Sequence, residues 1–134
     1  MPNERVDHTD RRRKWVGATC AALVLAAVAD AGPEIVESGS LVAGYDGPGP
    51  VIYLGVAAFI TAVRWHFVPL LAVAMSAFFI VGGIADADFA ERLATPGGLA
   101  FIAAWVQMLG FAAAVVCGTT AVRRHRVGGP VSIR

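Results

Sequence analysis

The stretch Leu99–Val122, LAFIAAWVQMLGFAAAVVCGTTAV, decides the fold class, because it runs for 24 residues without a charged side chain. About 20 apolar residues, wound as a helix, cross the roughly 30 Å hydrocarbon core of a bilayer. The composition points the same way, since 57% of the 134 residues are hydrophobic and 16% are charged. Soluble domains carry about 25% charged residues. We therefore expect an integral membrane protein and exclude a disordered chain.

Three further segments have the composition of membrane-spanning helices, and they are residues 15–31, 51–67 and 68–85. The segment 51–67 is the weakest, because its uncharged part is only 13 residues long and ends at Arg64. Thirteen helical residues span about 20 Å, so we expect Arg64 to extend toward the headgroups. Together with residues 99–122, these segments predict an all-α, four-transmembrane-helix antiparallel bundle that forms one domain.

Proline and glycine residues mark the ends of the predicted helices. Gly32-Pro33 is expected to end the first helix, and Pro96-Gly97-Gly98 separates the third helix from the fourth. The link between the second and third helices is the shortest, which indicates a tight antiparallel hairpin.

The basic residues are concentrated on one side of this predicted topology. The tails at 1–14 and 123–134 and the link between the second and third helices hold ten of the eleven basic residues and three acids. The segments 30–50 and 86–98 hold seven acids and one basic residue, Arg92. Basic residues favour the cytoplasmic side of a membrane. Four spans with both termini in the cytoplasm satisfy this rule, and ten arginines against one lysine suggest the inner membrane of a bacterium with a GC-rich genome.

The N-terminus has a second interpretation. The basic run Arg11–Lys14, the apolar stretch after it and the triplet Ala29-Asp30-Ala31 have the outline of a cleavable signal peptide. Cleavage after Ala31 leaves three spans and keeps the C-terminus inside. The apolar stretch is long for a signal peptide and Asp30 lies inside the cleavage motif, so we prefer an uncleaved first helix.

Small residues recur at helical spacing in the predicted spans. Gly110, Ala114 and Gly118 follow one another at intervals of four in the last span, and Gly55 and Gly83 lie in the second and third. Small side chains let helix backbones approach closely in a membrane. The pattern predicts a compact bundle, although contacts between copies of the chain would use the same spacing.

Gln107 is the most polar side chain deep in the predicted bilayer. Its amide needs hydrogen-bond partners there, and Ser76 or Thr61 on neighbouring helices are expected to supply them. One interpretation is an interhelical hydrogen bond that sets the helix register. The other is a polar contact for a lipid, a quinone or a solute.

Cys20 and Cys117 lie at similar depths in the cytoplasmic halves of the first and last spans. A thiol pair that faces the cytoplasm is usually reduced, and a cysteine in hydrocarbon behaves as a small apolar residue. We therefore expect both cysteines to fill space. A redox-active pair is the alternative.

All three histidines are placed on the cytoplasmic side, so haem held between two spanning helices is not expected. His66 and His125 without a nearby cysteine or carboxylate make a weak metal site. No metal and no cofactor is predicted. The basic residues near the helix ends are expected to contact anionic headgroups; with His66 they are Arg64, Arg123, Arg124 and Arg126.

The acidic group Asp86, Asp88 and Glu91 precedes the last span. The segment Asp86–Thr95 is expected to form either a solvated loop or a short interfacial helix with Asp86 or Asp88 as its cap. In a helix these three acids spread around the axis, so they do not predict a cation site.

The sequence contains no Ser/His/Asp set, no phosphate-binding loop and no Cys-x-x-Cys motif. It also places no ionisable residue at the middle of the predicted bilayer, where ion-coupled carriers have theirs. We therefore expect a non-catalytic accessory or assembly subunit, or a lipid-binding membrane protein. Its partners would be lipids, other membrane proteins or its own copies, and not nucleic acid. A small transporter or channel protomer is the first alternative, and a membrane oxidoreductase that uses a thiol pair, quinone or haem is the second.

Overall fold

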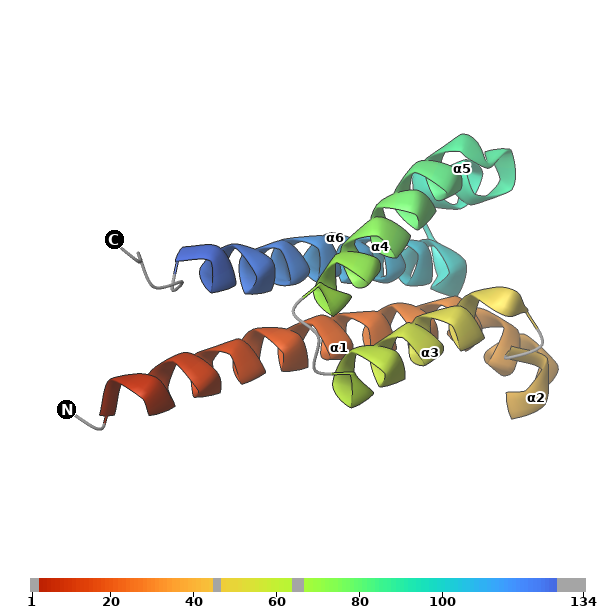
Figure 1. Ribbon diagram of the computed structural model, residues 1–134. Coiled ribbons are helices and arrows are strands. Elements are labelled where there is room, and N and C mark those ends of the chain that lie inside the picture. The colour runs from red at the N-terminus through yellow and green to blue at the C-terminus, as the bar shows by residue number, and fades with distance from the viewer. Residues whose placement is uncertain (1–2, 45–46, 64–66, 128–134) are drawn as a thin grey trace.

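The structure is a computed structural model that describes residues 3–44, 47–63 and 67–127, and these residues are almost entirely helical. Four helices form the body of the protein, and two short helices, α2 and α5, lie at one end of it (Figure 1). The bounds are Asn3–Ser38 for α1, Leu41–Gly44 for α2, Pro48–Ala62 for α3, Val68–Ala85 for α4, Ala87–Ala94 for α5 and Gly98–Val127 for α6. The predicted all-helical class is therefore confirmed.

Three of these helices are long and apolar enough to cross a membrane, over the residues Asp10–Ser38, Val68–Ala85 and Gly98–Arg124. The second predicted span is shorter than expected, because α3 has 15 residues and ends at Ala62. A helix of that length spans about 22 Å, which is less than the thickness of a typical hydrocarbon core.

The first helix is much longer than the predicted range 15–31, and the expectation that Gly32-Pro33 ends it is wrong. A proline inside a helix removes one backbone hydrogen bond and presses against the carbonyl group one turn earlier. It also conflicts with the Cβ of the residue before it, and Gly32 has no Cβ. α1 therefore continues through Pro33 to Ser38, and the following Gly39 closes it with a φ of 65° and an N–H bond to the Ile35 carbonyl.

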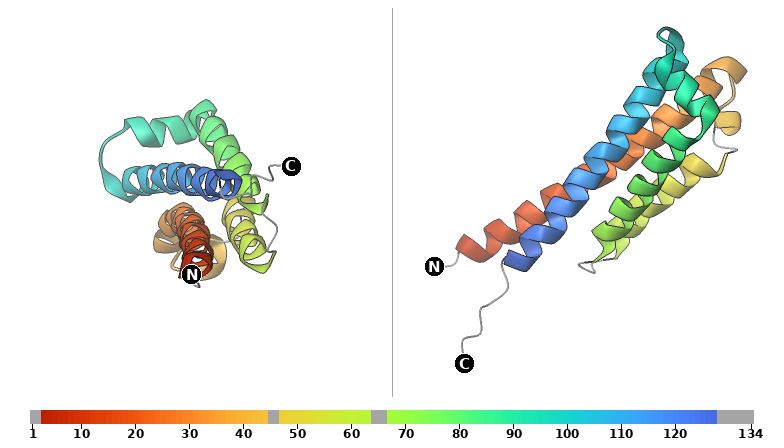
Figure 2. Two further views of the ribbon diagram at one scale, coloured as in Figure 1. Left: turned by 60° about the vertical axis from the view of Figure 1, so that its left-hand side comes forward. Right: turned by 90° about the horizontal axis from the view of Figure 1, so that it is seen from above.

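The helices α1, α3 and α6 run roughly alongside one another, while α4 is inclined to them (Figures 1 and 2). α6 packs along α1 and also contacts α4, and α3 packs against α1. The N-terminal end of α1 and the C-terminal end of α6 lie at the same end of the molecule. There the Arg124 guanidinium lies over the Trp15 ring, 5.6 Å from its centroid.

Glycines set the closest approach between helices. A Cβ placed on Gly110 would lie 3.0 Å from the Ala22 carbonyl oxygen and 3.1 Å from the Ala26 Cβ, so α6 and α1 touch almost backbone to backbone. A Cβ on Gly118 would lie 3.1 Å from the Pro69 carbonyl oxygen of α4. Glycine at these two positions therefore determines how closely α6 packs against two other helices.

The other predicted packing residues have different surroundings. Ala114 is fully buried between the helices. A Cβ on Gly83 would lie 2.9 Å from the Met108 Cε, so this glycine also marks a tight contact. Gly55 has no atom near the place where a Cβ would be, and it faces away from the bundle.

The last feature of the fold is the helix α5 between α4 and α6. Asp86 caps it, because the Asp86 Oδ1 accepts a hydrogen bond of 2.8 Å from the Phe89 N–H. Of the two structures expected for this segment, the short helix is the one that forms, and Asp86 is its cap. The Trp105 Nε1 of α6 donates to the Leu93 carbonyl oxygen over 3.3 Å, and this bond ties α5 to α6.

Candidate functional site

Three polar side chains from three helices meet inside the bundle. They are Asp30 of α1, Tyr53 of α3 and Gln107 of α6. The Gln107 side chain lies next to the Asp30 carboxylate and the Tyr53 hydroxyl and interacts with both. Tyr53 is only 2% exposed and Gln107 only 7%, while Asp30 is half-buried. We call these three residues the polar layer.

The Asp30 carboxylate lies against the first turn of α3. A Cβ placed on Gly49 would be 2.6 Å from the Asp30 Oδ2 and 3.1 Å from the Tyr53 Oη, so both oxygens occupy the space that a side chain would need. Pro48 and Pro50 have no N–H, so Gly49 and Val51 supply the unpaired N–H groups of this turn, and the positive end of a helix favours a negative charge nearby. Gly49 therefore makes room for the polar layer at the helix end that favours the Asp30 carboxylate.

The polar layer does not contain the residues that were expected to contact Gln107. Ser76 is fully buried, but its Oγ has no hydrogen-bond partner within the described part of the chain. The Thr61 Oγ1 donates to the Ala58 carbonyl oxygen of its own helix over 2.7 Å. The partners of Gln107 are Asp30 and Tyr53 instead, and sequence reasoning assigned neither of them to a site.

A signal for this contact is present in the sequence. Asp30 continues the series of alanines at positions 18, 22 and 26 along one face of α1, and Gln107 lies one turn before Gly110 on α6. Since Gly110 contacts Ala22 and Ala26, the antiparallel direction of the two helices brings Gln107 to Asp30. This contact was not predicted, because Asp30 was placed at the edge of the predicted span.

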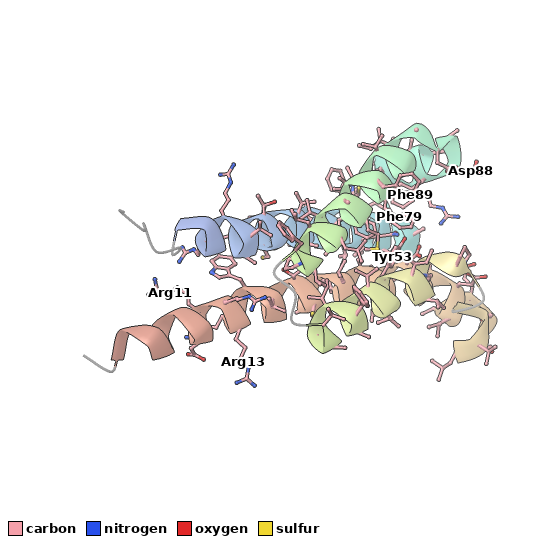
Figure 3. The ribbon with its side chains drawn as sticks, viewed as in Figure 1. Arg11, Arg13, Tyr53, Phe79, Asp88 and Phe89 are labelled. Carbon is pink, nitrogen blue, oxygen red and sulfur yellow. The ribbon has the colours of Figure 1, made fainter. Side chains whose placement is uncertain are left out.

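Three aromatic rings lie beside the polar layer. The Tyr53 ring meets the edges of Phe79 and Phe111, with centroid distances of 4.9 and 5.0 Å. Phe79 and Phe111 are stacked at 5.7 Å, and Figure 3 shows Tyr53 and Phe79 lying close together where α3 and α4 meet. Aromatic contacts of this kind hold the rings in fixed orientations. Tyr53 thus belongs to both the polar layer and the aromatic group.

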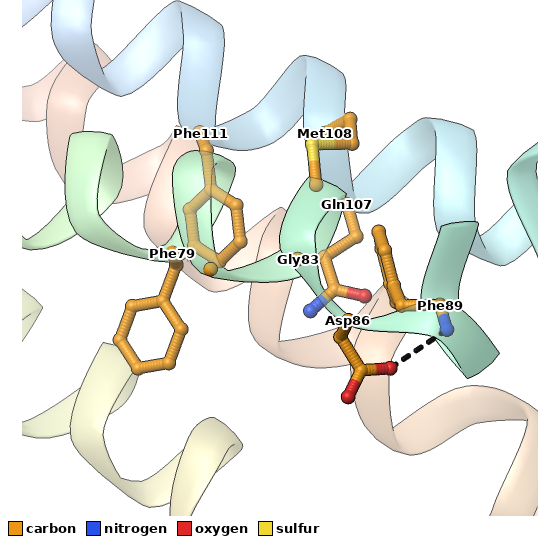
Figure 4. Close-up of a pocket in the computed structure, with 8 residues that line it drawn as sticks. Phe79, Gly83, Asp86, Phe89, Gln107, Met108 and Phe111 are labelled. Atoms are coloured by element: carbon orange, nitrogen blue, oxygen red, sulfur yellow. Dashed lines mark hydrogen bonds between the residues drawn. The ribbon is translucent and has the colours of Figure 1, made fainter.

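A pocket of about 260 Å³ opens between α4, α5 and α6. We call it the α4–α6 pocket (Figure 4). Its lining is mostly apolar and aromatic, with a carboxylate and an amide, and comprises Phe79, Gly82, Gly83, Asp86, Phe89, Gln107, Met108 and Phe111. Gln107 and Phe111 therefore connect the pocket to the polar layer and to the aromatic group.

A second pocket of about 190 Å³ lies between α1 and the beginning of α6. Its lining is apolar and comprises Val28, Ala29, Gly32, Pro33, Val36, Leu99, Ile102, Ala103 and Val106. It offers a ligand an apolar surface and no charged or polar side chain.

The two cysteines are both free and partly buried. The Cys20 Sγ donates to the Ala57 carbonyl oxygen of α3 over 3.6 Å, so this thiol is part of the contact between α1 and α3. Cys117 lies on α6 with intermediate exposure, and no disulfide joins the two residues.

The predicted headgroup contacts are described only in part. Arg123 and Arg124 are exposed at the end of α6, whereas Arg64 and His66 lie outside the described residues, as do the side chains of His125 and Arg126. Figure 3 shows Arg11 and Arg13 at the same end of the molecule. The described residues contain no group of three or more His, Cys, Asp or Glu side chains that could hold a metal ion.

Comparisons with known proteins complete the description of the site. No family model, no curated protein and no solved structure matches this chain.

Proposed function

We propose that this chain is a small multi-pass membrane protein without catalytic activity of its own, which acts by binding lipids or as an accessory or assembly subunit. The observation that carries this proposal is the distribution of polar and apolar groups. The polar side chains of the polar layer come from three helices and face one another inside the bundle. The outer surfaces of the long helices carry large apolar side chains such as Phe78, Val81 and Leu109.

Lipid binding is supported by the lining of the two pockets. The pocket between α1 and α6 is bordered by aliphatic side chains, which suit an acyl chain. The α4–α6 pocket adds aromatic rings and two polar side chains to a similar apolar wall. Both pockets are lined by residues of predicted membrane-spanning helices, so a ligand could enter them from the lipid phase.

For the topology we propose four spans in a bacterial inner membrane, with both termini in the cytoplasm. Basic residues such as Arg11, Lys14 and Arg123 belong to the end of the molecule where α1 begins and α6 ends. The acidic residues Asp86 and Asp88 belong to the opposite end, beside α5. The positive-inside rule places the basic end in the cytoplasm. α3 is the short fourth span, and the bilayer adapts to it by thinning locally.

The experiment that tests the proposal is extraction of the tagged chain from its native membrane with a mild detergent, followed by native mass spectrometry. We expect lipids or a stoichiometric partner to remain bound. Labelling of single cysteines introduced at Glu37 and at Arg123 tests the topology in the same cells. A chain that carries neither lipid nor partner, and that turns over a substrate on its own, contradicts the proposal.

A second function, a small ion-coupled transporter or channel protomer, is favoured by one specific observation. Asp30 is an ionisable side chain within a long apolar helix and faces Gln107 and Tyr53. Ionisable groups in such positions are common on ion and proton pathways. A carrier was not expected from the sequence, because no ionisable residue was placed at the middle of the predicted bilayer.

Solute or proton flux in proteoliposomes tests this second function with the variants Asp30→Asn and Glu34→Gln. Asparagine keeps an oxygen that accepts from Gln107 and removes the charge, while Glu34 is an exposed acid one turn away on the same helix. A coupled carrier loses flux in Asp30→Asn and keeps it in Glu34→Gln. Equal flux in the two variants and in the unaltered protein excludes a pathway role for Asp30.

A further inference from the structure

We propose that the α4–α6 pocket binds an organic ammonium ion carried on an apolar or aromatic body. This inference rests on the proposed binding function, because it names the class of ligand that one of the pockets takes. The lining of the pocket, its charge and its size support it.

The lining of the pocket includes three phenylalanine rings. Phe79, Phe89 and Phe111 all border the pocket, and the stacked pair Phe79 and Phe111 has a fixed orientation. The negative face of an aromatic ring attracts an ammonium group, most strongly where water is excluded. Met108 adds a polarisable thioether at the same wall.

The charged groups around the pocket favour a cation over an anion. Asp86 lines the pocket, and its Oδ1 caps α5, which leaves its Oδ2 for a ligand (Figure 4). Asp30 does not line the pocket, but it lies next to Gln107, which does, so it is a second acidic group near the pocket. Arg92 is the nearby basic group, and its charge acts on Asp30. Two carboxylates against one guanidinium give the pocket an excess of negative charge.

The size and openness of the pocket suit a body with one ring. An apolar cavity of about 150 Å³ is enough to hold benzene, and this pocket measures about 260 Å³. A Cβ on Gly82 would meet no atom within 4 Å, so the pocket is open beside this glycine. A Cβ on the adjacent Gly83 would lie 3.2 Å from the Phe89 Cδ1, so the pocket is closed on that side by α5.

Three probes with one ring and different charges test the proposal on the full chain in lipid nanodiscs. They are phenethylammonium, phenethyl alcohol and phenylacetate, and binding is followed by ligand-observed NMR with empty nanodiscs as the reference. We expect phenethylammonium to bind most tightly and phenylacetate not to bind. Equal binding of all three probes overturns the proposal, because it shows an apolar pocket without charge selectivity.

Three variants test whether phenethylammonium binds in the α4–α6 pocket. Asp86→Asn keeps a good helix cap and removes the charge, and we expect a loss of about three- to fivefold in phenethylammonium affinity. Phe89→Leu removes a ring face and should cost about two- to fivefold. Asp88→Asn is the matched control, since Asp88 is an exposed acid on the same helix and does not line the pocket. An equal loss in Asp88→Asn and Asp86→Asn overturns the proposal, because it shows general surface attraction.

Two further arms complete the experiment. Removal of the opposing charge in Arg92→Gln should raise the phenethylammonium affinity, and a decrease contradicts the proposed electrostatics. Two sets of nanodiscs with the same fraction of phosphatidylglycerol, completed with a neutral glycolipid in the first and with phosphatidylethanolamine in the second, distinguish two sources of the ammonium group. Weaker probe binding in the second lipid mixture shows that a lipid headgroup competes for the pocket, and unchanged binding shows that the site takes a free amine. This readout uses the purified chain, so it is independent of whether a partner protein co-purifies.

Discussion

The two halves of the bundle are held together in different ways. In the half near the start of α1 and the end of α6, Leu23 and Ile60 form a hydrophobic core with smaller residues such as Ala72 and Ala114. The buried Thr19 hydroxyl of this half donates to a carbonyl oxygen of its own helix. In the half near α5, the core around Phe111 is joined by the polar layer and the aromatic group. Lipid is as apolar as the side chains it replaces, so burial alone does not hold membrane helices together. Close contacts between small residues therefore dominate in the first half, while the second half adds polar side chains and ring contacts.

The largest expected effect is in the half that depends on polar contacts. Gln107→Leu removes the partner of both Asp30 and Tyr53 and leaves a half-buried carboxylate without its amide. We expect the free energy of unfolding to fall by about 2–3 kcal/mol. The measurement is an SDS titration in mixed micelles. Gln107→Glu is not a suitable control, because it adds a charge, so Gln107→Asn serves to test whether the length of the side chain matters.

The next effect tests close approach between backbones. Gly110→Val places a side chain against the Ala22 carbonyl oxygen, a backbone atom that cannot move without shifting α1. Overpacking of this kind costs about 1–3 kcal/mol. Gly55→Val is the matched control, because Gly55 lies in a helix with open space around it. Equal losses in the two variants would show that the glycines act through helix propensity and not through the packing of α1 on α6.

The smallest effect concerns Ser76, a buried polar side chain without a partner in the described part of the chain. Ser76→Ala removes an unsatisfied hydroxyl and loses no hydrogen bond, so we expect no change or a gain of up to about 1 kcal/mol. The comparison with Gln107→Leu is informative, because both positions were expected to belong to one polar contact. A clear loss of stability in Ser76→Ala would show that the hydroxyl has a partner in the membrane.

The predictable part of the fold was the part that local composition controls. The apolar run 68–85 coincides with α4, and Asp86 caps α5 as a residue of its type does before a short amphipathic helix. The expectation that Gly32-Pro33 ends the first helix was wrong, because a proline predicts a helix end only on average and the preceding glycine reduces the steric conflict. The packing role of Gly110 was visible as a spacing, but that spacing was also present at Gly55, which packs against nothing within the described residues.

Only one residue of the candidate site could be predicted from the sequence. Gln107 was recognised by its polarity in an apolar run, while Asp30 and Tyr53 were placed at the edges of their segments. Their contact depends on the register between α1 and α6 and on the position of the first turn of α3. Neither of these is a property of any single segment.

The order of residues along the chain is enough to predict that it is helical and apolar enough for a membrane, and how charge is divided between the two sets of connecting segments. These properties follow from residue type and spacing along one helix at a time. Contacts between helices cannot be predicted in this way. That Asp30, Tyr53 and Gln107 form one polar layer, and that a pocket opens between α4, α5 and α6, is seen in the folded chain alone. The physical reason is that hydrogen bonds and cavities between helices depend on how close the backbones come, and glycines at a few crossing points set that distance.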